Sequence, residues 1–107
     1  MFLLILIENC KCEPLTYIKA IENADASFEG LVIDIKEDEI VSRVINPIKQ
    51  INDSIIIIKN DKECAYNFEK NKLYRFFLKK KDNYFITNKC MGNSYIEEYE
   101  EYRDYSE

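Results

Sequence analysis

Cys10-Lys11-Cys12 is the stretch whose residue types and spacing could do chemistry, and Cys64 and Cys90 stand far downstream of it. Successive side chains of an extended strand point to opposite faces, so Cys10 and Cys12 point the same way. The chain between them is too short for a relaxed disulfide. Four cysteines allow three pairings, and discarding Cys10–Cys12 leaves two. In both, the N-terminal segment is tied to two distant points.

A four-cysteine zinc site is the competing interpretation of these residues. Structural zinc sites usually bring their cysteines in pairs separated by two to four residues, whereas Cys64 and Cys90 each stand alone. The spacing therefore favours two disulfides over zinc ligation, with free thiols as a third alternative. Disulfides indicate an oxidising compartment.

The composition excludes several classes of protein. The 107 residues suit one domain, and 47% hydrophobic content argues against disorder. The net charge of −5 disfavours a nucleic acid partner, because binding requires cations that neutralise phosphates. The chain has no histidine, the commonest general base and metal ligand. With no recognisable pair of nucleophile and base, the sequence does not predict an enzyme.

Residues 1–9 resemble the end of a secretory signal peptide, because an apolar run, Phe2–Ile7, precedes Cys10. A first β-strand and a lipid-attachment signal ending at Cys10 are the alternatives. No stretch approaches the roughly 20 apolar residues of a membrane helix, so we expect no stable membrane insertion. The predicted organisation is a signal-peptide remnant (1–9) followed by one domain (10–107).

Short strands between turn signals, with a helix at each end, predict a mainly β fold. A five-stranded Greek-key barrel of the OB-fold type, with a short N-terminal helix and a C-terminal helix, is the simplest closure. Gly30 predicts a bulge or bend and Pro47 predicts a sheet edge. The helices are expected at Pro14–Ala26 and Ser94–Tyr105, and the strands at Phe28–Lys36, Ile40–Ile51, Ser54–Lys59, Lys72–Lys80 and Tyr84–Thr87.

The apolar residues of these strands supply the predicted core. The Ile55–Ile58 run has no alternation, which indicates burial on both faces. Truncation of Ile57 to Ala is then expected to cost about 2–5 kcal/mol. The predicted core comprises Phe28, Leu31, Ile33, Ile55–Ile58, Phe76 and Ile86.

Several segments together resemble the netrin-like domain, the family of the tissue inhibitors of metalloproteinases (TIMP-like proteins), and most closely its short bacterial-type members. Their order and spacing carry the resemblance from Cys10 to about Asn93, and the family fold is an OB-type barrel. The segments are Cys10-Lys11-Cys12-Glu13-Pro14, Asn23–Val32, Cys64-Ala65-Tyr66-Asn67-Phe68, Asn71-Lys72-Leu73-Tyr74 and Thr87-Asn88-Lys89-Cys90.

This resemblance implies disulfides Cys10–Cys64 and Cys12–Cys90 and a secreted or periplasmic protein with no intrinsic metal or cofactor. It further implies inhibition of a zinc metalloprotease through the edge Cys10, Lys11 and Cys12. The α-amine and carbonyl of Cys10 would ligate the protease zinc, and Lys11 would enter the specificity pocket. The alternative is a secreted binding or structural module without inhibitory activity, whose partner is an unknown extracellular protein.

Overall fold

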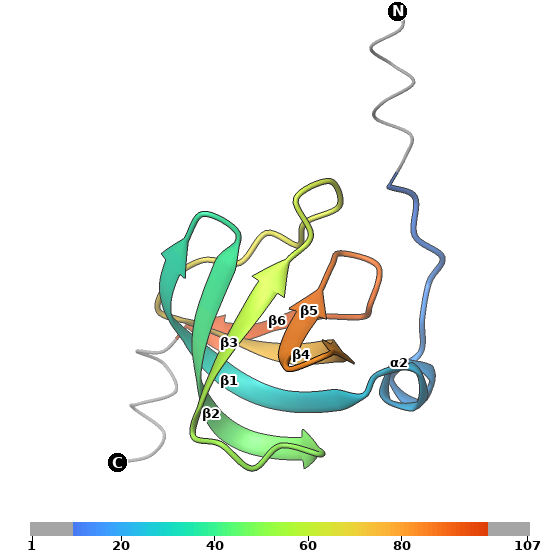
Figure 1. Cartoon of the computed structure of the whole chain (residues 1–107). Coiled ribbons are helices and arrows are strands. Elements are labelled where there is room, and N and C mark those ends of the chain that lie inside the picture. Colours follow the sequence, from blue (N-terminus) through green and yellow to red (C-terminus); the bar gives the residue numbers. More distant parts are fainter. Residues whose placement is uncertain (1–9, 99–107) are drawn as a thin grey trace, which may run out of the picture.

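The computed structural model describes residues 10–98, which contain one short helix and six strands (Figure 1). The predicted signal-peptide remnant, 1–9, lies outside these residues. No helix in the described part is long and apolar enough to cross a membrane. The elements are α2 (Tyr17–Asn23), β1 (Ala26–Lys36), β2 (Glu39–Lys49), β3 (Ile55–Asn60), β4 (Lys72–Lys81), β5 (Tyr84–Thr87) and β6 (Ser94–Glu98).

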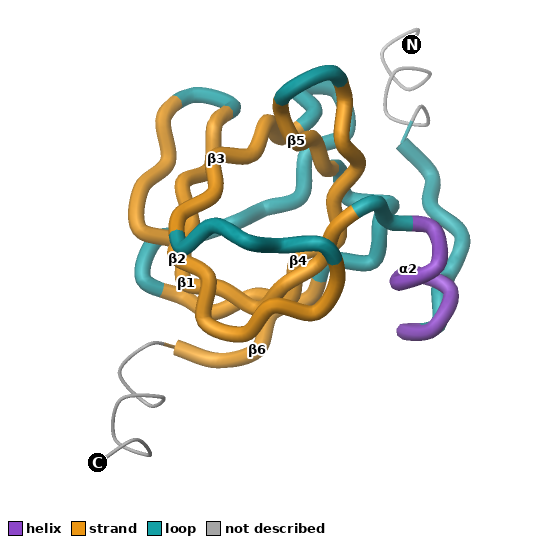
Figure 2. The backbone as a smooth tube through the Cα atoms, turned by 60° about the horizontal axis from the view of Figure 1, so that its bottom comes forward, coloured by secondary structure: helices purple, strands orange, loops and turns teal. Residues whose placement is uncertain are grey.

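Five of the strands close into a barrel. Hydrogen-bonded neighbours follow the order β1-β2-β3-β5-β4, and β4 pairs back onto β1. All of these pairs are antiparallel except β3 with β5, which is parallel. The tube in Figure 2 follows this ring. The predicted mainly β, five-stranded OB-type barrel is therefore confirmed.

Gly30 allows β1 to bend between its two neighbours, β2 and β4. The register of β1 against β2 shifts between Glu29 and Gly30, as the predicted bulge requires. A Cβ atom at Gly30 would lie 2.7 Å from the carbonyl oxygen of Arg43 and would also meet the buried Ser42 hydroxyl. Glycine is needed here because β2 approaches the backbone of β1 too closely for a side chain.

Pro47 lies where β2 has only one neighbour. It is aligned with Phe28 of β1, whereas β3 pairs with β2 only from Glu39 to Arg43. Proline has no amide hydrogen to donate, so it is tolerated where no second strand needs that hydrogen bond. The edge predicted from Pro47 is present.

Stacked aromatic rings fill the barrel. The rings of Phe28 and Phe76 are 4.6 Å apart between centroids, and Phe68 stacks on Phe76 at 5.0 Å. Ile33 and Ile86, which the sequence places in the core, are only half-buried. The predicted core residues that are buried are Phe28, Leu31, Ile56, Ile58 and Phe76.

The isoleucine run in β3 alternates, contrary to the prediction of burial on both faces. Ile56 and Ile58 point into the barrel, whereas Ile55 and Ile57 are 46% and 56% exposed. In the described part of the chain, only the inner face of β3 packs against a hydrophobic core. Because successive side chains of a strand point to opposite faces, every second isoleucine is exposed to solvent. The prediction that Ile57 is buried is wrong, so the expected cost of about 2–5 kcal/mol for Ile57→Ala loses its basis.

Helix α2 is shorter than the predicted Pro14–Ala26. Thr16 caps its N-terminus, and the Thr16 side chain accepts a hydrogen bond from the amide three residues on. At the other end, the Lys49 ammonium donates to two carbonyl oxygens, at 2.8 and 2.7 Å. A cation near the carbonyl end of a helix is favourable because those carbonyls have no partner in the helix.

A second, smaller apolar cluster attaches α2 to the outside of the barrel. Ala20 and Ala24 are buried there against Phe77 of β4. Gly92, which has a φ of +100°, lies so close that a Cβ atom would be 2.8 Å from the Cβ of Ala20. The helix therefore packs against the outer face of β4 and against the segment that follows β5.

The C-terminal helix predicted over Ser94–Tyr105 is wrong for Ser94–Glu98, which form strand β6. β6 pairs antiparallel with the start of β4, with Ser94 aligned with Arg75. The Tyr95 and Tyr74 rings meet edge-on at 5.8 Å. Pairing with β4 thus prevails over a local helix signal worth a few tenths of a kcal/mol per residue. Residues 99–105 of the predicted helix lie outside the described residues.

Candidate functional site

The candidate site is the N-terminal strap, residues 10–16, an extended segment without regular structure that leads into α2. Cys10 is half-buried, whereas Lys11 and Cys12 are exposed. In Figure 1 the strap is the blue segment along one side of the barrel. A short extended segment cannot hold one conformation alone, because it has neither a hydrophobic core nor β-sheet hydrogen bonds of its own. Two loops of the barrel supply its attachment points.

The first loop, 61–71, connects β3 to β4 and carries Cys64. Asn60, at the end of β3, holds it by two hydrogen bonds with Tyr66, donating to the Tyr66 carbonyl oxygen at 2.8 Å and accepting from its amide at 3.1 Å. The Asp61 carbonyl oxygen accepts from the Cys64 amide at 3.2 Å. Cys64 is therefore presented from a clamped turn.

The second loop, 88–93, connects β5 to β6 and carries Cys90. Buried Asn93 accepts a hydrogen bond from the Phe77 amide at 2.7 Å and donates to the Thr87 hydroxyl at 2.8 Å. The Asn88 side chain accepts from the Cys90 amide at 2.8 Å. Buried polar groups that are all satisfied make a rigid network, which fixes the position of Cys90.

The two loops also bind each other. The Lys89 amide donates to the Cys64 carbonyl oxygen at 2.9 Å, and the Asp61 amide donates to the Thr87 carbonyl oxygen at 3.0 Å. The barrel and the contacts between the two loops therefore hold the attachment points, in addition to the disulfides. The asparagines that hold them, Asn60 and Asn93, were missed in the sequence, where a polar residue beside a loop gives no signal of burial.

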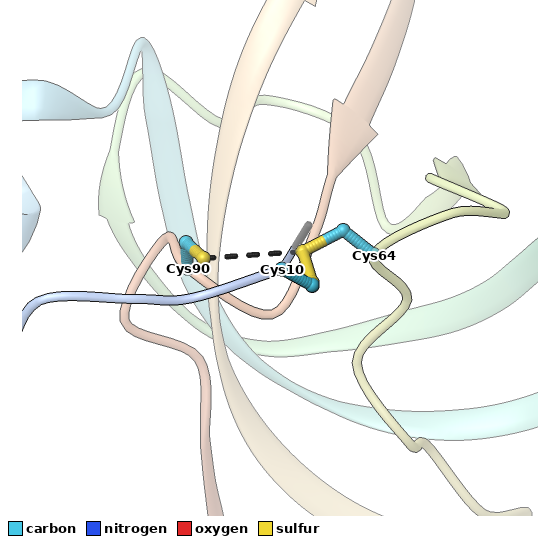
Figure 3. A group of neighbouring side chains, drawn as sticks. All are labelled: Cys10, Cys64 and Cys90. Atoms are coloured by element: carbon cyan, nitrogen blue, oxygen red, sulfur yellow. Dashed lines mark hydrogen bonds between the residues drawn. A yellow bond between two sulfur atoms is a disulfide. The ribbon is translucent and has the colours of Figure 1, made fainter. Parts of the chain in front are cut away.

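Disulfides Cys10–Cys64 and Cys12–Cys90 join the strap to these loops, and they are the pairing that the family resemblance implies. The Sγ atoms of Cys64 and Cys90 lie 3.9 Å apart, drawn as the dashed line in Figure 3. This is a contact between the two bridges, since sulfurs within disulfides carry no hydrogen. The Lys11 carbonyl oxygen lies 3.8 Å from the Cys90 Sγ. The backbone of the strap is thus held on both sides of Lys11.

Aromatic packing beneath the first loop joins it to the core. The Tyr66 ring contacts Phe68 at 4.6 Å and Tyr74 edge-on at 6.0 Å. Burial raises the pKa of the Tyr66 hydroxyl, because it disfavours the phenolate. Burial is also the main reason why the pKa of Tyr74 is raised, although its hydroxyl accepts a hydrogen bond from the Glu69 amide at 2.8 Å.

A separate exposed apolar face lies on the outer side of β3 and β5. Ile55, Ile57 and Tyr84 are each at least 40% exposed and, with Lys59 and Asp53, line a shallow depression of about 310 Å³. The Lys59 ammonium lies 5.5 Å from the centroid of the Tyr84 ring. The sequence reasoning missed this face because it assigned the isoleucines to the core.

No protein-family model and no curated protein matches this chain.

Proposed function

We propose that this protein is a secreted or periplasmic, netrin-like (TIMP-like) inhibitor of a zinc metalloprotease, acting through the edge Cys10-Lys11-Cys12. One observation supports it most: an exposed strap that two disulfides fix to loops held by the barrel. Fold alone does not imply function, so the argument depends on this edge. Two disulfides also suit an extracellular or periplasmic location.

The open coordination position of a catalytic zinc defines the chemistry that the strap must supply. Such a zinc has three protein ligands and one bound water, and an inhibitor must replace that water. A neutral α-amine at Cys10 has a lone pair for the metal, and the carbonyl oxygen of the same residue is placed to bind the metal together with it. A segment fixed before binding loses less conformational entropy on association. The bridges at Cys10 and Cys12 supply this preorganisation.

Lys11 is the residue that sets selectivity in this proposal. It follows the zinc-ligating residue and is exposed. A lysine loses hydration when it enters a pocket, at a large cost unless the pocket offers a carboxylate. We therefore expect the target protease to have an acidic specificity pocket. Lys11→Thr should widen the range of proteases inhibited, since the shorter neutral side chain removes that cost.

The α-amine requirement provides the test. Protein beginning at Cys10 is assayed against a panel of zinc endopeptidases beside the same protein with one additional N-terminal Ala. The proposal predicts inhibition by the first form only, because the second places at the metal a peptide nitrogen whose lone pair is delocalised into the carbonyl group. Equal inhibition by both forms would contradict amine chelation. The panel includes endopeptidases with acidic and with apolar specificity pockets, so that an absence of inhibition by either form cannot be explained by the wrong type of pocket.

The second candidate is a binding module that uses the exposed apolar face of Ile55, Ile57 and Tyr84. Two exposed isoleucines on β3, beside the exposed Tyr84 of the neighbouring strand β5, are the observation that favours it, because grouped apolar residues at a surface mark protein contacts. Absence of inhibition by either form, with both disulfides mapped, would favour this function. Ile57→Ser should then abolish capture of an extracellular protein partner, and Lys11→Thr should not.

A further inference from the structure

The two disulfides gather sulfur atoms from three separate segments at one place. The Sγ atoms of Cys10, Cys64 and Cys90, whose side chains are drawn in Figure 3, all lie within 4.8 Å of one another. Cys12 is bonded to Cys90. The three cysteines of the group come from the strap and from the two loops, and each is half-buried. These three cysteine sulfurs thus form one cluster, to which the Cys12 sulfur is bonded through Cys90.

One distance in the cluster matches the sulfur spacing of a tetrahedral thiolate site. Four sulfurs at about 2.3 Å from a zinc ion lie about 3.8 Å from one another. The Sγ atoms of Cys64 and Cys90, which are not bonded to each other, are 3.9 Å apart. When a dithiol or phosphine reductant breaks the two bridges, each bonded pair separates to van der Waals contact, which for sulfur is close to the same distance.

The two loops are also held by contacts other than the disulfides. The Lys89 amide bonds to the Cys64 carbonyl oxygen, and Asn60 and Asn93 hold the two loops to the barrel. The large apolar cluster of the barrel contains no cysteine. These contacts favour Cys64 and Cys90 staying adjacent in a reduced chain, and the metal has to hold the strap beside them.

We propose that the reduced chain binds one Zn²⁺ through the thiolates of Cys10, Cys64 and Cys90, with Cys12 as the fourth ligand. Reduction adds two electrons and two protons to each disulfide and yields four thiols. Coordination of the metal then releases four protons, because zinc binds thiolates and not thiols. The metal replaces both bridges, so the strap stays attached to the loops under oxidising and under reducing conditions.

Cobalt provides the optical probe. Protein reduced with a non-chelating phosphine is titrated with Co²⁺ without oxygen, beside protein with its disulfides intact. The reduced protein should develop thiolate-to-cobalt charge-transfer bands and tetrahedral d–d bands that saturate at one equivalent and disappear when Zn²⁺ is added. The oxidised protein should develop neither.

Two single substitutions make a matched pair. Cys12→Ser keeps the three clustered thiolates, so the charge-transfer band should persist at lower intensity. Cys64→Ser removes a central ligand and should abolish the band at stoichiometric cobalt. Far-UV circular dichroism checks the barrel in each sample. A reduced chain that binds no cobalt, whether folded or unfolded, would overturn the proposal, as would a band that survives Cys64→Ser unchanged.

Discussion

Removal of either disulfide should cost nearly the same free energy of unfolding, although the two bridges span different lengths of chain. Cys10–Cys64 spans 54 residues and Cys12–Cys90 spans 78. Considered separately, the chain-entropy model gives about 4.2 and about 4.5 kcal/mol for the two loops. The bridges start two residues apart, however, so each one shortens the loop that the other has to close.

With one bridge intact, the second closes a much shorter path. This path runs between Cys10 and Cys12, across the intact bridge, and along the 26 positions between Cys64 and Cys90. A closed loop of about 28 residues is worth about 3.6 kcal/mol in the same model. The path is the same whichever bridge is removed, so both losses should be about 3.6 kcal/mol. Removing both should cost about 8 kcal/mol, more than the sum of the two.

Urea unfolding at equilibrium, followed by far-UV circular dichroism, measures these losses. The variants are Cys10→Ala with Cys64→Ala, Cys12→Ala with Cys90→Ala, and all four together. Single-bridge losses that differ by more than about 1.5 kcal/mol would refute the shared-path reasoning. So would a loss below about 1 kcal/mol for either bridge.

Three further predictions concern the barrel itself. Ile58→Ala should lower the free energy of unfolding by about 2–5 kcal/mol, because Ile58 is buried, and Ile57→Ala, at an exposed neighbour, by less than about 1 kcal/mol. Equal losses for the two variants in urea unfolding would contradict the orientation of β3. Gly30→Ala should cost about 1–3 kcal/mol because its Cβ would meet the backbone of β2, and an unchanged thermal midpoint would show that this approach is not close. The pKa of Tyr74 is raised in the folded state, so its stabilising contribution is complete below pH about 10 and is lost as the pH rises through the folded-state pKa. The free energy of unfolding should therefore fall in that pH range, and it should fall less in Tyr74→Phe. An ultraviolet titration in which every tyrosine ionises at the ordinary pKa would contradict this.

The barrel could be predicted from the sequence because its strands carry local signals. Gly30 marks the bend at which β2 closely approaches β1, and Pro47 marks the edge where β2 is no longer paired with β3. Short runs of turn residues separate the strands, and with such short connections five strands can form a closed barrel in only a few topologies. The residues of the strap could also be selected, since two cysteines so close together must each bond elsewhere.

The errors occur where long-range pairing decides the structure. An unbroken isoleucine run does not reveal which face of β3 has a core behind it, so Ile55 and Ile57 were misplaced. Ser94 opens a good local signal for a helix, and only the open edge of β4 makes a strand more favourable there. The clamps formed by Asn60 and Asn93 depend on partners that folding brings together, and no local pattern predicts them.

The mature N-terminus is the most direct test of the proposed mechanism, because only a chain that begins at Cys10 has an α-amine there. Protein isolated from its native compartment is digested without reduction, and its N-terminal and disulfide-linked peptides are identified by mass spectrometry. We predict a free amine on Cys10 and linked peptides that join Cys10 to Cys64 and Cys12 to Cys90. A residue preceding Cys10, or an acylated Cys10, would contradict inhibition by amine chelation.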